Sequence, residues 1–100
     1  MGEQLKVLVV DDDRRMVKTI CDILLVKGHS AEPAYSGEEA IEMVKAKDFD
    51  CVLMDLKMEG IDGIETLKQI KKIAPDLPVV MMSAYATEEQ MEEAMRLGAY

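Results

Sequence analysis

Four side chains suited to phosphate or metal chemistry stand at the ends of apolar segments. Asp11 and Asp12 directly follow one such segment, Asp55 closes a second, and Ser83 follows a third. If the fold brings the acids together, two carboxylates about 4 Å apart repel by roughly 4 kcal/mol at an effective dielectric constant near 20. A divalent cation offsets this repulsion, and an oxygen-only ligand set favours Mg²⁺ or Mn²⁺ over Zn²⁺. The pattern therefore predicts a Mg²⁺ site, with Mn²⁺ as the alternative metal.

A plainer interpretation of the first acids is a solvated cluster at the start of a helix, where negative charge is favourable. We prefer that interpretation for Asp13 alone. For Asp11 and Asp12 it leaves unexplained why another acid, Asp55, ends a second apolar segment. A nucleotide-binding loop after the first segment would be glycine-rich, whereas this loop is acidic, so that kind of phosphate site is disfavoured.

Three short apolar runs, at residues 5–10, 50–55 and 78–82, are typical of strands, and a weaker strand is expected at 31–35. The first run is rich in β-branched residues, which predicts a strand buried on both faces. The weaker strand contains Pro33, which cannot donate to a sheet ladder and therefore predicts an edge strand.

The segments between these runs have helical spacing. The first helix is expected over residues 14–27 and ends at Gly28, and its inward face carries Val17, Ile20, Cys21 and Leu24. A capping box from Ser36 to Glu39 begins the second helix, and the third runs from Ile64 towards Pro75.

A second capping box at residues 87–90 predicts a fourth helix that closes at Gly98. The residues expected to face the core from this helix are Met91, Ala94, Met95 and Leu97.

Strict alternation of four strands and four helices requires a parallel sheet with right-handed crossovers and helices on both faces. We therefore expect a doubly wound α/β fold. In such a sheet, ligands bind outside the carboxyl ends of the strands. This topology would bring Asp11, Asp12, Asp55 and Ser83 to one edge of the sheet.

The composition predicts one folded domain over residues 1–100, since 49% of the residues are hydrophobic. A net charge of −8 disfavours direct binding to nucleic acid or to an anionic membrane. No run is long enough to cross a bilayer and no leader is visible, so we expect a cytoplasmic protein. Cys21 and Cys51 lack metal or disulfide spacing and are predicted to be buried thiols, and the lone His29 is predicted to have no functional role.

An ordered set of motifs resembles the receiver domain of two-component response regulators, over the entire chain. The motifs are Val-Leu-Val-Val-Asp-Asp-Asp at 7–13, Val-Leu-Met-Asp-Leu-Lys-Met at 52–58, Gly-Ile-Asp-Gly at 60–63, Val-Val-Met-Met-Ser-Ala-Tyr at 79–85 and Gly-Ala-Tyr at 98–100. Each motif alone is weak, but the ordered set is highly specific. The resemblance implies a flavodoxin-like fold, similar to chemotaxis receivers, and a role as a phosphorylated switch in phosphorelay signalling, not as an enzyme.

The same resemblance implies a role for each site residue. Asp55 would accept a phosphoryl group from a sensor histidine kinase. Asp12 and Asp55 would bind Mg²⁺ directly, Asp11 partly through water, and the backbone carbonyl of Lys57 would complete the protein's share. Ser83 would hydrogen-bond the phosphoryl group, and the signal would pass to an output domain or partner protein outside this chain.

The sequence also departs from the family pattern, which continues after Gly-Ala with an aromatic residue, a lysine followed by proline, and a fifth strand and helix. We therefore expect a C-terminally incomplete receiver of four strand–helix units. If these 100 residues are the whole polypeptide, the strand at 79–82, from Val79 to Met82, would be an open edge, which predicts a homodimer through that edge or through a swapped segment. The equally favoured alternative is that the chain is a truncated piece of a longer receiver.

Two other functions stay open at this point. Without the family's lysine, the chain could be a pseudo-receiver or assembly fragment that binds partners without phosphorylation. A Mg²⁺-dependent phosphohydrolase that uses Asp55 as nucleophile is disfavoured, because Lys57 stands where a general acid is expected.

Overall fold

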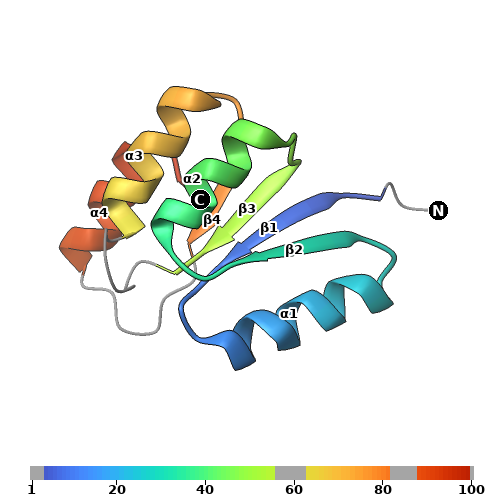
Figure 1. Ribbon diagram of the computed structural model, residues 1–100. Helices are drawn as coiled ribbons and strands as arrows, with labels where there is room; N and C mark the ends of the chain where they lie inside the picture. Colours follow the sequence, from blue (N-terminus) through green and yellow to red (C-terminus); the bar gives the residue numbers. More distant parts are fainter. Residues whose placement is uncertain (1–3, 56–62, 82–87, 100) are drawn as a thin grey trace.

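The computed structural model describes residues 4–55, 63–81 and 88–99, which form one parallel sheet with helices on both faces (Figure 1). The strands are β1 (Lys6–Val10), β2 (Ser30–Ala34), β3 (Cys51–Met54) and β4 (Val79–Met81). The helices are α1 (Arg14–Val26), α2 (Gly37–Ala46), α3 (Gly63–Ile73) and α4 (Glu88–Arg96). The strand order is β2-β1-β3-β4, so the predicted doubly wound α/β fold is confirmed.

The central strand β1 is buried on both faces, as its β-branched sequence predicts. It pairs in parallel with β2 on one side and with β3 on the other. Pro33 of β2 lies opposite Val9 of β1, and β2 is an edge strand of the described sheet. The predicted edge position is therefore confirmed, although β2 begins and ends one residue earlier than expected.

The two faces of the sheet are covered unequally. On one face α1 packs against β1 and β2 through Val17, and Ile20, Cys21 and Leu24 lie beside it as expected. On the other face α2, α3 and α4 share a larger core that includes Val44, Leu67, Ile70 and Ala94. Figure 1 shows this arrangement, with α1 alone on its side of the sheet.

The ends of the helices follow the predicted signals. Ser36 caps α2 by accepting a hydrogen bond from the N–H of Glu39, and Asp13 caps α1. Gly28 and Gly98 have φ values of 90° and 102°, in the left-handed region where a residue with a Cβ is strained. Both glycines therefore close their helices as expected.

Two packing predictions were wrong. Met95 was expected in the core but is 67% exposed, because the buried residue of this turn is its neighbour Ala94. Adjacent helix positions point about 100° apart, so both cannot face α3. Cys21 and Cys51 are free but half-buried, since α1 covers the β1 and β2 half of its face.

Three other predictions concern residues outside the described parts of the chain: the capping threonine Thr87, the site residues Lys57 and Ser83, and the last residue of the predicted edge strand, Met82. The same holds for the side chain of Met91. Within the described ranges, none of the helices has both the length and the apolar character that crossing a membrane requires.

Candidate functional site

The parallel pairing of β1 with β3 brings two of the predicted acids to one edge of the sheet. Val10 lies opposite Met54, so the next residues along, Asp11 and Asp55, follow neighbouring strands. The N–H of Asp55 donates to the Val10 carbonyl at 3.0 Å, and the N–H of Asp11 donates to the Ala34 carbonyl at 3.1 Å. These bonds extend the ladder past the strand ends and fix the backbone that carries both carboxylates.

The three consecutive aspartates after β1 have different surroundings. Asp11 is 7% exposed, and its Oδ1 accepts the N–H of Asp13 at 3.0 Å. Asp12 is exposed. The Oδ1 of Asp13 accepts the N–H groups of Arg15 and Met16, at 3.1 and 3.2 Å, and so caps α1. The helix-start interpretation is therefore right for Asp13, and Asp11 is the acid that turns into the protein.

The charges at this edge of the sheet act on Asp11. Burial raises the pKa of its carboxyl, and the negative charges of Asp55 and Asp12 raise it further, while the hydrogen bond from the Asp13 N–H partly opposes them. The carboxyl groups of Asp55 and Asp12 therefore both interact with that of Asp11.

The residues present fit a hard cation that needs few protein ligands. Among the described residues, no three acidic, histidine or cysteine side chains converge closely enough to hold a metal by themselves. Mg²⁺ does not require such a set, since it is usually bound by one or two carboxylates and keeps several waters. The donors that Asp11, Asp12 and Asp55 offer are all oxygens, which suits Mg²⁺ or Mn²⁺.

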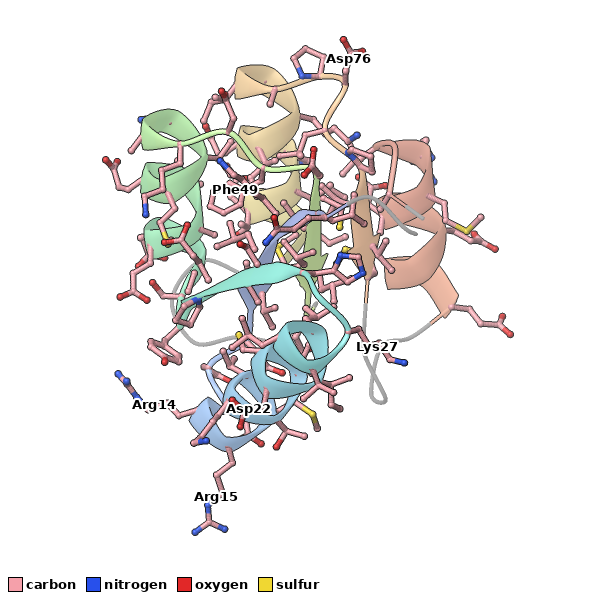
Figure 2. The ribbon with its side chains drawn as sticks, turned by 90° about the vertical axis from the view of Figure 1, so that its right-hand side faces the viewer. Arg14, Arg15, Asp22, Lys27, Phe49 and Asp76 are labelled. Atoms are coloured by element: carbon pink, nitrogen blue, oxygen red, sulfur yellow. The ribbon has the colours of Figure 1, made fainter. Side chains whose placement is uncertain are left out.

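Sequence reasoning missed a cation beside this edge. The guanidinium carbon of Arg14 lies 4.1 Å from the centroid of the Tyr35 ring, within the range of a cation–π interaction. Arg14 opens α1 and Tyr35 follows β2. The two are far apart in sequence, and only the pairing of β1 with β2 brings them together. Figure 2 shows Arg14 and Arg15 extending outward from the start of α1.

One hollow of the described surface lies away from the acids. Its volume is about 520 Å³, and its lining includes Lys6, Ser30, Lys47 and Phe49, at the end of the sheet where β1 and β2 begin. The acids lie at the ends where the strands finish. The predicted acids therefore do not line this hollow.

Comparison with known proteins agrees with this geometry. The family model of the response regulator receiver domain matches residues 7–100. The chain belongs to this family. It is a receiver domain of a two-component response regulator, and receiver domains in general are signalling switches.

Three relatives of this receiver illustrate the match. It is 43% identical over 98 residues to the transcriptional regulatory protein ZraR of Klebsiella oxytoca, covering 98% of this chain and 22% of that protein. A CheY-like receiver domain from Methanospirillum hungatei has a TM-score of 0.93 at 27% identity, over 97% of this chain and 78% of the other. A chain of the CheX–CheY–BeF₃–Mg²⁺ complex from Borrelia burgdorferi has a TM-score of 0.89 at 32% identity, and the match covers 95% of this chain and 73% of that one. The receiver thus spans about a fifth of the ZraR length.

Proposed function

We propose that Asp55 accepts a phosphoryl group from a phosphohistidine of a sensor histidine kinase, in a reaction that needs Mg²⁺. The observation that carries this proposal is the parallel pairing of β1 with β3, which places the buried Asp11 and half-buried Asp55 at neighbouring strand ends, where their negative charges repel. Such mutual repulsion is costly to keep in a fold unless a cation offsets it.

Each residue has a distinct task in this proposal. A carboxylate oxygen of half-buried Asp55 attacks the phosphorus, which forms an O–P bond and breaks the P–N bond of the donor. Asp12 and Asp55 would hold Mg²⁺, Asp11 would act partly through water, and the backbone carbonyl of Lys57 would be a further protein ligand. When bound, Mg²⁺ offsets the negative charge on the oxygens of the transferring group. The Ser83 hydroxyl donates a hydrogen bond to the phosphoryl group after transfer.

Two relatives support the partners in this proposal. The Borrelia relative is named as a complex with BeF₃ and Mg²⁺. The Klebsiella relative is named as a transcriptional regulator and is much longer than this chain. We infer that the phosphorylated receiver passes its signal to an output domain or to a partner protein. The added phosphoryl group brings close to two negative charges, which is enough to change what the edge of the sheet binds.

Intact-mass analysis after incubation with acetyl phosphate and Mg²⁺ tests the acceptor. We expect one added phosphoryl group on the wild type and none on Asp55→Asn. Asp48→Asn is the matched control, because it makes the same chemical change on an exposed acid that lines the hollows at the opposite end of the sheet. It should be phosphorylated like the wild type.

The same reaction without Mg²⁺ should give no adduct. An adduct on Asp55→Asn would assign the acceptor to another residue. No adduct on the folded wild type would favour a receiver that works by binding alone.

A further inference from the structure

The outer surface of α1 keeps apolar side chains that the sheet does not cover. Ile23 is 51% exposed and Val26 is 87% exposed. With Asp22 and Lys27 they line a shallow hollow of about 240 Å³ at the C-terminal end of the helix. Figure 2 shows Lys27 extending into solvent beside this end of α1. The hollow could receive one apolar side chain, with a cation at its rim.

The outer surface of α4 carries a projecting apolar side chain beside an acidic one. Met95 projects with 67% of its surface exposed. Glu92 is exposed and stands one turn before Met95, so the two side chains share a face of the helix. The neighbouring Glu93 pairs with Arg96 at 2.9 Å, whereas Glu92 and Lys27 take part in none of the ion pairs within the described chain.

The two helices are also complementary in overall charge. From Arg14 to its cap Lys27, α1 carries four basic residues and one acidic residue, a net charge of +3. In α4 there are four glutamates and one arginine, a net charge of −3. In a chain whose net charge is −8, α1 is therefore a local basic surface and the natural complement of α4.

We propose that α4 of one copy of this chain docks on α1 of a second copy. Met95 enters the hollow between Ile23 and Val26, and Glu92 faces Lys27. Within one molecule the contact cannot form, because α1 packs on one face of the sheet while Ala94 of α4 belongs to the core on the other face (Figure 1). Each copy thus offers two different surfaces, and a contact between unlike surfaces can propagate from copy to copy.

The contact is small and rests on solvent-exposed charges, so it is weak and sensitive to salt. Its dissociation constant should be on the order of 0.1 mM, as expected for an interface below the usual size. At about 0.1 M salt, screening over about 10 Å suppresses the repulsion between two negatively charged copies but leaves the close pair of Lys27 and Glu92 effective. At about 0.5 M salt this pair is screened as well.

Sedimentation equilibrium tests the proposal through the rise in weight-average mass when salt is lowered from about 0.5 M to about 0.1 M. The wild type should show that rise. Lys27→Glu and Glu92→Lys should each lose it, because like charges then face each other. An equimolar mixture of the two variants should regain it, since every contact between unlike copies again pairs opposite charges. The double variant should regain it alone.

Arg15→Glu is the matched control, because it makes the same charge change on an exposed residue of α1 that is in none of the ion pairs within the described chain. Arg15 lies twelve residues before Lys27, about 18 Å along the helix, which is farther than the screening length of about 10 Å at about 0.1 M salt. The control variant should keep the association within about a factor of two, the effect of one exposed charge. Circular dichroism should show all variants folded, since every substituted residue is exposed. A wild type with no salt-sensitive rise, or a mixture that stays as dissociated as its components, would overturn the proposal.

Discussion

Three adjacent aspartates after β1 show how strongly position governs the behaviour of one residue type. Asp13 uses its carboxylate to cap α1, and Asp12 stays in solvent. Asp11 is turned inward against Asp55, and burial with two neighbouring charges raises its pKa. A buried carboxyl of this kind destabilises the metal-free fold whenever it is ionised. The candidate site is therefore also a weak point in stability.

Asp11→Asn should stabilise the protein without Mg²⁺ at pH 7, because the amide removes the charge and its oxygen can still accept the Asp13 N–H. A gain of about 1 kcal/mol would raise the melting temperature by roughly 4–8 °C in a domain of this size. With Mg²⁺ the order should reverse, since a ligand at 100 times its dissociation constant stabilises the wild type by about 2.7 kcal/mol. Thermal melts with and without chelator measure both effects.

The gain from Asp11→Asn should also depend on pH. The pKa of Asp11 is raised above its ordinary value of 3.8, so ionisation costs stability. This cost is absent below that value, grows as pH rises through it, and is complete above the raised pKa. Asp13→Asn is the control, because asparagine caps a helix as well as aspartate does. An equal gain in stability from Asp13→Asn would contradict a cost of ionisation that is specific to Asp11.

At the scale of single elements, the start of α2 shows local chemistry acting as its sequence predicts, with one difference. Ser36 accepts the N–H of Glu39 at 3.1 Å. The Glu39 carboxylate, however, accepts the N–H of Tyr35 and not that of the capping serine. The ring of Tyr35 also stacks with the Arg14 guanidinium, so this cap connects the start of α2 with the start of α1.

Ser36→Ala should destabilise the domain by about 1 kcal/mol, because it leaves an N–H of the first helical turn without its acceptor. Urea unfolding followed by circular dichroism measures the change. Ser30→Ala is the matched control, since the Ser30 hydroxyl accepts a long hydrogen bond of 3.5 Å from Gln4. It should cost less than half as much, and equal losses would show that the cap at Ser36 contributes nothing specific.

The elements themselves could be predicted because their signals are local. Alternating strands and helices, the caps at Asp13 and Ser36 and the glycines that end helices all depend on neighbouring residues. The exposure of Met95 could not be predicted, because Met95 and Ala94 are both apolar and only the contact with α3 decides which one is buried.

In the candidate site, too, the features that depend on tertiary side-chain contacts could not be predicted. The convergence of Asp11 and Asp55 could be predicted from strand order alone. The stacking of Arg14 on Tyr35 could not, because each residue is an ordinary exposed side chain until β1 and β2 pair. The roles assigned to Lys57 and Ser83 stay predictions, since both lie outside the described residues.

At the scale of the whole molecule, the two edges of the sheet differ in how well they are protected from pairing with another strand. In the described sheet β4 is an edge strand that pairs with β3 alone, and Val80 lies opposite Leu53. The other edge, β2, contains Pro33, which cannot donate to a new strand, whereas β4 contains neither proline nor charge. For the 100 residues by themselves we therefore keep the prediction of a homodimer through residues 79–82, from Val79 to Met82.

An edge-to-edge dimer rests on backbone hydrogen bonds and apolar contacts, so it should persist at about 0.5 M salt, where the contact between α1 and α4 is screened. Under these conditions the weight-average mass of the wild type should rise with concentration and level off at the dimer, because two like edges close on each other. Val80→Lys should weaken this dimer at least about tenfold, since lysine on an edge strand opposes pairing. Ala31→Lys, on the edge that Pro33 already guards, is the control and should leave the dimer unchanged. If Val80→Lys dimerised as well as the wild type, the dimer would have to use a surface other than β4, and the exposed apolar residues of α1 would be the next to test.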